Sequence, residues 1–355
     1  MGKGIAVFRG RTIGIDLGDR RSSACVLDEG AEVVRRFEVA TTEAALRRAL
    51  ESEPASRVVI EVGTHSPWAS RVLEERGHEV LVANPRRVRL IAEGHDKSDR
   101  VDAETLARLG RADPKLLHPI RHRGAQAQED RALLTVRDGL VRARVLLVNQ
   151  ARGIAKSLGR RLPRCTTEGF ARCLRRAGAL GRFPGLEALV EAVEALNVQI
   201  RRLEADIEAV SGSRYPETRQ LRQVSGVGAL TALSFVLTIE DPGRFRRSRA
   251  VGPYLGLRPK RRQSGGSDPA LRISKQGDAF TRRMLVQAAH YVLGPFGPDT
   301  DLRRFGERLI ARGGRAAKKK AIVAVARKLA VLLHRLWVTG EIYQPLGASV
   351  LAPAA

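Results

Sequence analysis

The chain has 355 residues, enough for two domains, and an apolar fraction of 43% allows each domain a hydrophobic core. It carries 63 Lys and Arg against 38 Asp and Glu, and the resulting net charge of +25 favours a polyanionic partner, most often nucleic acid. No apolar run approaches the ~20 residues that span a bilayer, and the N-terminus lacks the apolar stretch of a signal peptide. The three cysteines follow no pattern. We therefore expect a cytoplasmic protein with no membrane contact and no disulfide bond.

The first hundred residues alternate strand and helix signals. Apolar and β-branched runs predict strands at 12–18, 23–28, 32–39, 57–63 and 79–85. Capping signals predict a helix that Thr41 or Thr42 caps and that runs to about Leu50, a second helix from a Ser66 N-cap followed by Pro67 to about Arg76, and a third at 97–109. Three strands, then helix, strand, helix, strand and helix, is the order of an RNase H-like (RuvC-like) domain with a mixed sheet. We assign residues 1–125 to this α/β domain.

Residues 126–215 are predicted to be a helical, coiled-coil region. The first helix covers about 128–158. A seam with alternating spacings of 3 and 4 follows at Leu186, Leu189, Val193, Leu196, Ile200, Leu203, Ile207 and Val210. This heptad pattern favours a coiled coil, within the chain or between chains, although packing in the chain's own helical bundle produces the same spacing.

Residues 216–345 are predicted to be mainly helical, with a tail at 346–355. The stretch 221–239 reads as helix, glycine turn and helix, and resembles a helix-hairpin-helix whose glycines bring backbone N–H groups to a phosphate. Basic residues among Gly and Pro turns follow, and the final helix, from about 318 to 338, opens on a Lys run that is a phosphate contact or a solvated face. The predicted nucleic-acid contacts are Gly226, Gly228, Lys260, Arg261, Arg262, Lys275, Arg282 and Arg283.

Four carboxylates fall where a metal-dependent nuclease needs them. Asp16 lies on the first strand, and its side chain is expected on the face opposite to that of Ile13 and Ile15. Glu61 ends an otherwise apolar strand. Asp99 and Asp102 are three apart on one helix and share a face. Clustered acids repel each other unless a cation is shared, and oxygen-only ligands suit Mg²⁺ or Mn²⁺ rather than zinc.

Structural roles remain open for these residue types. Asp99 and Asp102 also suit the N-terminal turn of a helix, where acids interact favourably with the dipole. His118 and His122 flank a proline without any accompanying CxxC, so no zinc site is expected there. The nearby acids interpreted as turn or surface residues are Asp19, Asp28 and Asp96.

Ser264 lies in a basic, glycine-rich loop, between the basic run 260–262 and a Gly pair. A serine hydroxyl attacks phosphate only when a base or a metal lowers its proton affinity, and flanking guanidinium groups can stabilise the pentavalent transition state. A flexible Ser/Gly turn is the plainer interpretation. On local chemistry alone, Ser267 and Ser274 are rival candidates.

Two motif sets, in order along nearly the whole chain, carry a family resemblance. The first set is IGIDLG, the strand ending at Glu61, VANP and KSDRVDAETLARL. The second is VSGVGALTA, YLGLRPKRRQSGG and RISKQGDAFTRRML. With these motifs the chain resembles the DEDD-type, serine-dependent insertion-sequence transposases guided by a bridge RNA, which are related to pilin-type site-specific DNA invertases. It departs from them at Gln263, where the family often has a second serine, and in VGTHSPW after Glu61.

The resemblance implies functions for named residues. Asp16, Glu61, Asp99 and Asp102 match the family's four metal-binding acids, and Ser264 matches its catalytic serine. It implies that Ser264 attacks donor and target DNA to form a phosphoserine, assisted by Mg²⁺. It further implies guidance by a noncoding bridge RNA, and a dimer or tetramer joined through the coiled coil whose protomers share active sites.

Two other functions fit the residues themselves. In a metal-only nuclease of the Holliday-junction resolvase type, water attacks the phosphodiester and Ser264 is only a turn residue. A noncatalytic nucleic-acid-binding protein needs only the positive charge. If the chain is a metal-only nuclease, Ser264→Ala retains DNA cleavage, whereas the recombinase loses it. If the chain is a noncatalytic binding protein, Asp99→Ala changes no activity because there is none to lose.

Overall fold

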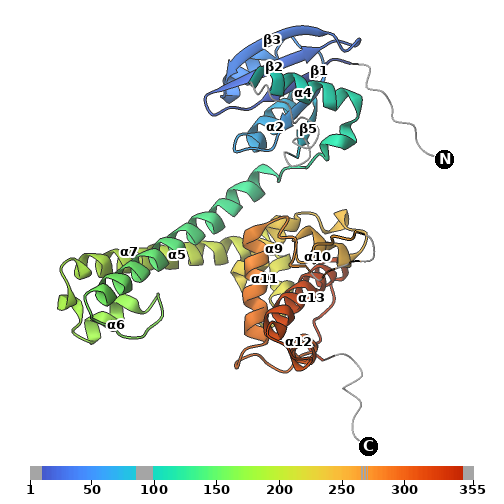
Figure 1. The fold of residues 1–355 in the computed structure, drawn as a ribbon. Coiled ribbons are helices and arrows are strands. Elements are labelled where there is room, and N and C mark those ends of the chain that lie inside the picture. The colour runs from blue at the N-terminus through green and yellow to red at the C-terminus, as the bar shows by residue number, and fades with distance from the viewer. Residues whose placement is uncertain (1–9, 85–98, 265–266, 268, 270, 347–355) are drawn as a thin grey trace, which may run out of the picture. The chain divides into compact units, whose positions relative to one another are not determined.

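The computed structural model describes residues 10–84, 99–264, 267, 269 and 271–346, with only the backbone given for Asp99 and Arg100 (Figure 1). The chain divides into two compact units, Met1–Ala125 and Gln126–Ala355, which are described in turn. The four-part division drawn from the sequence stays a prediction. In the described ranges no helix is both long enough and apolar enough to cross a bilayer.

The first unit is built on a five-stranded mixed sheet. Its strands are β1 (Thr12–Asp16), β2 (Arg21–Leu27), β3 (Val33–Ala40), β4 (Arg57–Glu61) and β5 (Glu79–Ala83). They lie in the order β3-β2-β1-β4-β5. β2 pairs antiparallel with β1 and with β3, whereas β4 pairs parallel with β1 and with β5. The predicted mixed sheet is confirmed, and its assignment as RNase H-like stays a prediction.

Helices cover both faces of this sheet. Ile13, Ile15 and Ile60 pack on one face with residues of α1 (Glu43–Ala49) and α2 (Ser66–Glu75). On the other face, Val59 packs with Leu106 of α4 (Asp99–Ala112). Because side chains alternate along a strand, one strand contributes to both cores. Ile13 and Ile15 of β1 and Ile60 of β4 therefore face α1 and α2. Gly14 of β1 and Val59 of β4 face α4 on the other side of the sheet.

The capping predictions had different outcomes at the two helices. Thr42 caps α1, with its hydroxyl accepting a hydrogen bond from the Ala45 N–H at 3.3 Å, as predicted. At α2 the predicted Ser66 cap is wrong, because Ser66 is the first helical residue and His65 holds the cap position. The Ser66 hydroxyl accepts from the Gly63 N–H at 3.0 Å and donates to the Gly63 carbonyl at 2.9 Å. It therefore closes the turn after β4 instead of capping the helix.

The second unit contains a long antiparallel helix pair, α5 (Ala125–Ser157) and α7 (Leu186–Arg214), with the short α6 (Phe170–Arg176) beside it (Figure 1). Arg137 pairs with Glu204, and the Arg144 Nη1 donates to Asn197 Oδ1 at 2.7 Å. From the first pair to the second, the residue number increases along α5 (137 to 144) and decreases along α7 (204 to 197), so the two helices run in opposite directions.

The predicted heptad seam of α7 packs within the chain. Its alternate positions Leu186, Val193, Ile200 and Ile207 are buried. The intervening positions Leu189, Leu196, Leu203 and Val210 are half-buried. The within-chain alternative therefore accounts for one side of the seam, while a coiled coil between copies stays a prediction.

The remainder of the second unit is mainly helical, as predicted. Its helices are α8 (Glu217–Leu221), α9 (Ala229–Ile239), α10 (Val251–Tyr254), α11 (Ala279–Val292), α12 (Asp301–Ala311) and α13 (Ala317–Thr339). Phe235, Leu285 and Leu329 belong to their shared core. α8 and α9 flank the glycine turn that resembled a helix-hairpin-helix. The lysines at 318–320 are exposed at the start of α13.

Candidate active site and nucleic-acid contacts

Two of the predicted metal-binding acids end adjacent parallel strands. Asp16 is the last residue of β1, and Glu61 is the last residue of β4. The register pairs Ile15 with Ile60, so the next residues, Asp16 and Glu61, are neighbours at one edge of the sheet. Alternation places both acids on the face of Val59, which α4 covers. Both acids are half-buried.

Helix α4 is held against this face at very short range. A Cβ atom added to Gly14 would lie 2.0 Å from the Ala103 carbonyl oxygen, so only glycine allows the two backbones to meet. Arg57, at the start of β4, donates from Nη1 to the Gly110 carbonyl near the end of α4 at 3.1 Å. The helix therefore runs antiparallel to β4, and its N-terminus lies at the edge where the strands end.

The remaining two acids come from this N-terminus. Asp102 is half-buried and directly precedes Ala103, the residue in contact with β1. Asp99 is the first residue of α4, and its side chain lies outside the described residues. Among the residues whose side chains are described, no group of three or more His, Cys, Asp or Glu converges closely enough to hold a metal ion. The donor set contains only oxygen, which fits Mg²⁺ or Mn²⁺.

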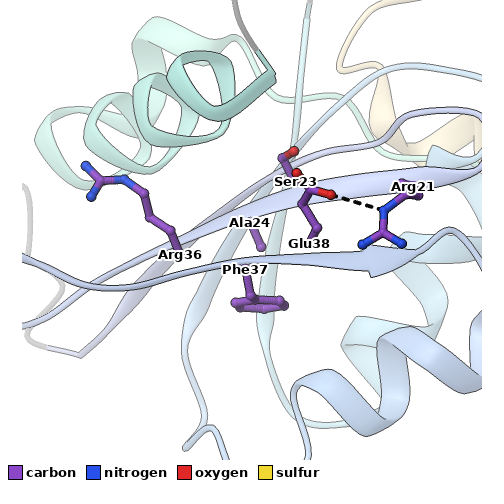
Figure 2. Close-up of a pocket in the computed structure, with 6 residues that line it drawn as sticks. All are labelled: Arg21, Ser23, Ala24, Arg36, Phe37 and Glu38. Atoms are coloured by element: carbon purple, nitrogen blue, oxygen red, sulfur yellow. Dashed lines mark hydrogen bonds and ion pairs between the residues drawn. The ribbon is translucent and has the colours of Figure 1, made fainter.

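A polar row that the sequence analysis missed extends from Asp16 across the sheet. Asp16 pairs with Ser23, and Ser23 pairs with Glu38. The last two residues line a hollow of about 440 Å³ together with Arg21, Ala24, Arg36 and Phe37 (Figure 2). Figure 2 shows Arg36 and Phe37 pointing to opposite sides of β3. The alternation of β3 would have identified Glu38 once the strand register was known.

Arg36 ties this row to α4. Its Nη2 donates to Glu104 Oε2 at 2.6 Å, and Arg108 bonds the same carboxylate. The hydrogen bond from Arg36, followed by that from Arg108, lowers the pKa of Glu104. Glu104 is thus held as a carboxylate that anchors the helix carrying Asp102.

Two histidines lie near the end of β4. His122 Nε2 is 2.9 Å from the Ser66 hydroxyl, which also binds Gly63, two residues after Glu61. Burial, with the nearby arginines 71 and 123, lowers the pKa of His122 and keeps it neutral at neutral pH. His65 Nε2 is 3.7 Å from Asp19 Oδ1. The sequence offered no signal that relates His122 to this edge of the sheet, because its partner Ser66 lies 56 residues away along the chain.

Ser264 lies at the tip of a narrow loop in the second unit. The loop is closed at its base by the pairing of Pro259 with Ile273, where the Lys260 N–H donates to the Arg272 carbonyl at 2.9 Å. At the tip Ser264 pairs with Ser267, with its N–H 3.3 Å from the Ser267 carbonyl. The glycines between these serines lie outside the described residues.

The three candidate serines differ in position. Ser264 and Ser267 are both exposed at the tip, whereas Ser274 is half-buried at the base, where its N–H donates to the Arg258 carbonyl at 2.9 Å. The preceding side chains Lys260, Arg261 and Arg262 are exposed. A phosphate that approaches the tip therefore meets basic groups first.

The glycines of the α8–α9 turn have different roles. Gly226 has a φ of +86°, and a Cβ atom there would lie 3.0 Å from Tyr291 Cδ1 and 3.1 Å from the Ala288 carbonyl. It is therefore required by the turn and by packing on α11. Gly228 is exposed at the N-cap of α9, and no side chain caps that helix. This glycine allows the backbone approach that a phosphate contact requires.

Of the other three basic residues predicted to contact nucleic acid, one is exposed and two bind groups of the protein itself. Lys275 is exposed, with a φ of +56°. Arg282 donates from Nη1 to the carbonyls of Leu255 and Gln276 at 3.0 and 2.8 Å, and burial lowers its pKa. Arg283 forms an ion pair with Asp138 at 2.6 Å. Arg282 thus anchors the base of the serine loop, in addition to any role toward nucleic acid.

Comparison with known proteins identifies two family matches. A model of the DEDD transposase domain of IS110 elements, described as a transposase, matches residues 13–158. A second model, described as transposase of the IS116/IS110/IS902 family, matches residues 218–301. The first range contains all four predicted acids, and the second contains the α8–α9 turn and Ser264.

Several curated transposases resemble the chain over most of its length. It is 30% identical to the transposase for insertion sequence element IS1328 of Yersinia enterocolitica over 285 residues, which cover 78% of this chain and 82% of the relative. It is 27% identical to the transposase for element IS1111A of Coxiella burnetii over 347 residues, 94% of this chain and 91% of the relative. It is 29% identical to a probable family 20 transposase of Pseudomonas aeruginosa over 344 residues, 94% and 98% of the two chains.

Proposed function

This chain belongs to the IS116/IS110/IS902 family of transposases and is an enzyme that acts on DNA, and on that basis we propose that it cuts and rejoins DNA through a phosphoserine at Ser264. The observation that carries the proposal is the position of this hydroxyl. It is exposed at the tip of a loop that is closed at its base and flanked by three exposed basic side chains. Such a loop brings a nucleophile and positive charge to a phosphodiester together.

The covalent step exchanges one phosphodiester for another. The Ser264 Oγ forms a bond to phosphorus, one P–O bond of the DNA breaks, and the hydroxyl proton ends on the DNA oxygen that leaves. Lys260, Arg261 and Arg262 hold the phosphate during this exchange. Because the energy of the broken ester is retained in the serine ester, the reverse attack by a DNA hydroxyl rejoins strands without a high-energy cofactor.

The four acids hold the metal ion in this proposal. Asp16, Glu61, Asp99 and Asp102 bind Mg²⁺ or Mn²⁺ in an RNase H-like fold, where the ion supplies positive charge to the phosphate and lowers the proton affinity of an attacking or leaving oxygen. The neighbouring strand ends of Asp16 and Glu61 and the antiparallel course of α4 support this assignment. Glu104, held by Arg36, keeps the start of α4 in place.

Target choice and assembly complete the proposal. Donor and target DNA are selected by base pairing with a noncoding bridge RNA from the same element, and copies of the chain associate through α5 and α7 as a dimer or tetramer. The net charge of +25 supports binding of two nucleic acids. Apolar side chains exposed on this helix pair, Leu146 and Val198 among them, support the association.

A covalent-capture assay tests the serine. The full chain is incubated with Mg²⁺, its flanking RNA and labelled donor DNA, then denatured and run on a gel. We expect a slow-migrating protein–DNA band that falls by at least about 10³-fold in Ser264→Ala, because the nucleophile is absent. Ser267→Ala is the matched control, since it removes the other exposed hydroxyl at the same loop tip and should retain the band.

The same assay separates the alternative mechanism. DNA cleavage without an adduct, unchanged in Ser264→Ala and lost in Asp102→Asn, would assign the reaction to metal-activated water and refute the phosphoserine. Under the proposal, Asp102→Asn and chelation of Mg²⁺ each abolish both adduct and cleavage, and added Mn²⁺ restores the chelated wild-type reaction.

A further inference from the structure

Phe296 is an exposed aromatic residue of the second unit. Its side chain is 83% exposed, more than any other large apolar side chain in the described part of the chain. Single exposed apolar residues are common on protein surfaces, so exposure alone carries no function. The structure of the loop that presents Phe296 is what distinguishes it.

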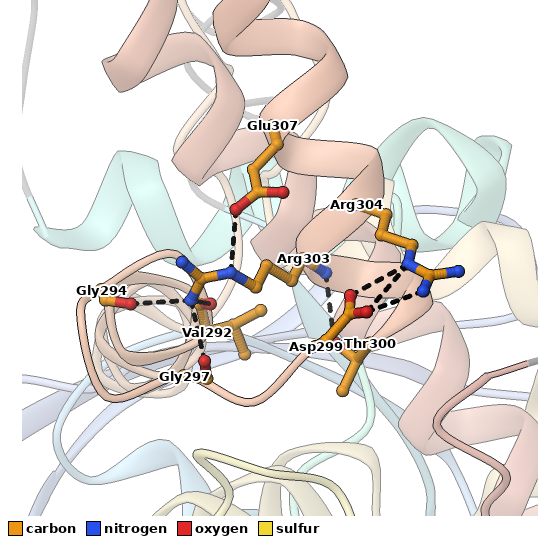
Figure 3. Close-up of polar contacts among 8 residues, drawn as sticks. All are labelled: Val292, Gly294, Gly297, Asp299, Thr300, Arg303, Arg304 and Glu307. Carbon is orange, nitrogen blue, oxygen red and sulfur yellow. Dashed lines mark hydrogen bonds and ion pairs between the residues drawn. The ribbon is translucent and has the colours of Figure 1, made fainter.

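The loop between α11 and α12 is closed around one guanidinium group. Nη1 of Arg303 donates to the carbonyls of Val292, Gly294 and Gly297 at 3.1, 2.7 and 2.9 Å (Figure 3). Its Nε donates to Glu307 at 2.8 Å on the same helix, which fixes the direction of the side chain. Both ends of the loop are therefore tied to the first turns of α12.

The loop's own sequence removes its remaining freedom. It reads Gly294-Pro-Phe-Gly297-Pro, and each proline restricts its own φ angle. A Cβ atom at Gly294 would lie 2.9 Å from the His290 carbonyl, and one at Gly297 would lie 2.3 Å from the Val292 carbonyl. Arg304 pairs with Asp299 just beyond the loop (Figure 3). Phe296 thus projects from a backbone that is already ordered before any ligand binds.

A rigidly presented aromatic ring is suited to binding, because little side-chain or loop entropy is lost when it meets a partner. The surroundings favour nucleic acid as that partner. Arg303 and Arg304 are engaged in bracing the loop, but six further basic side chains between 308 and 320 are exposed along the chain that follows it, against the acids Asp299, Asp301 and Glu307. An apolar protein partner gains nothing from such charge, whereas a nucleic-acid strand binds the cations through its phosphates and the ring through a base.

We propose that Phe296 is a stacking platform for an unpaired nucleobase of the nucleic acid on which this enzyme acts. Bases inside an intact duplex already stack on each other, so the ring acts on a strand that is open or single. The proposal rests on the family's action on DNA and not on the chemistry of Ser264. It can therefore be tested in a Ser264→Ala background, where failure of the covalent mechanism has no effect on the result.

The test measures binding of the full-length Ser264→Ala chain to three labelled probes by fluorescence anisotropy. The probes are a short single-stranded DNA, an RNA of the same sequence and the corresponding DNA duplex. We expect Phe296→Ala to weaken single-strand binding by about 5- to 100-fold and leave duplex binding unchanged. Loss on the DNA probe alone, or on the RNA probe alone, identifies which strand supplies the base.

Three further variants and probes sharpen the result. Phe296→Trp should retain the affinity, because it keeps a stacking ring. Ile342→Ala, which truncates another highly exposed apolar side chain, should change nothing. A single-stranded probe carrying 2-aminopurine should lose fluorescence on binding the wild-type ring, and not on binding Phe296→Ala.

The proposal is overturned if Phe296→Ala binds the single strands like the parent, or if it loses single-strand and duplex affinity equally. It is also overturned if the substitution changes the oligomeric state in light scattering with no change in affinity, which would assign the ring to a second copy. Since the side chain is exposed, Phe296→Ala should keep the thermal unfolding midpoint of the parent.

Discussion

At the scale of single residues, the first unit carries a buried histidine outside the proposed site. His78 accepts a hydrogen bond at Nδ1 from the Ser56 N–H at 3.2 Å, and its buried Nε2 has no hydrogen-bond partner among the described residues. Burial, followed by the charge of Arg76, lowers the pKa of His78. Protonation would also remove the acceptor at Nδ1, so the folded state retains the neutral ring.

This arrangement predicts that stability falls in mild acid. The folded pKa lies below the unfolded value of about 6.5, so the unfolded state binds more protons as pH falls through that value, and the free energy of unfolding decreases. We expect the thermal midpoint to drop between about pH 7.5 and about pH 5.5, and the drop to be smaller in His78→Gln. His118→Asn, which changes an exposed histidine of the same unit, is the control. An equal drop in His78→Gln would show that other groups cause the pH dependence.

At the scale of elements, the contact between β1 and α4 determines where the acids of α4 lie. Gly14→Val places a side chain where the Ala103 carbonyl already sits, at 2.0 Å, so the helix must move off the sheet. We expect a loss of about 1–3 kcal/mol or more in the free energy of unfolding, measured by urea denaturation. We also expect loss of the metal-dependent cleavage.

The control for this prediction is Gly63→Ala in the same unit. A Cβ atom there would meet nothing within 4 Å, so its unfolding free energy should stay within about 0.5 kcal/mol of the parent. If Gly14→Val were equally neutral, the close approach of α4 would not be needed for stability.

The periodic spacing of apolar residues identified the helices more completely than it identified which helices pack together. The heptad seam of α7 identified the buried positions Leu186, Val193, Ile200 and Ile207. It did not identify α5 as the partner, because any apolar helix satisfies the same spacing. The buried contact of Arg144 with Asn197 helps to set that pairing, and neither residue had an apolar signal to detect.

At the scale of the whole molecule, each hydrophobic core belongs to one unit. The clusters around Ile13, Val59 and Cys25 draw only on residues before 126. Those around Phe235, Phe170 and Leu134 draw only on residues after it. Each unit therefore has the means to fold without the other.

We predict that residues 1–125, produced alone, unfold cooperatively, and that the full chain shows a transition at the same temperature. Circular dichroism and calorimetry of the fragment and the full chain provide the comparison. A fragment without a cooperative transition would mean that the first unit depends on the rest of the chain.

The sequence by itself determined the five strands and three helices described in the first unit, its mixed α/β character, the long helices of the second unit and the residue types of the candidate site. These follow from local signals: apolar period, capping residues, and the spacing of acids and bases along the chain. Motif order also sufficed to indicate the transposase family, because family motifs are properties of the sequence. The sequence did not predict α6, α11 or α12.

Only the tertiary structure decided which residues are neighbours. The register of β1 with β4 made Asp16 and Glu61 adjacent, and the course of α4 brought Asp102 to the same edge. The use of Ser66 in a turn and the closure of the Phe296 loop by Arg303 depend likewise on groups that meet only in the fold. The reason is physical: a hydrogen bond or a backbone contact depends on distance in space, and one-dimensional spacing fixes that distance only within a single helix or strand.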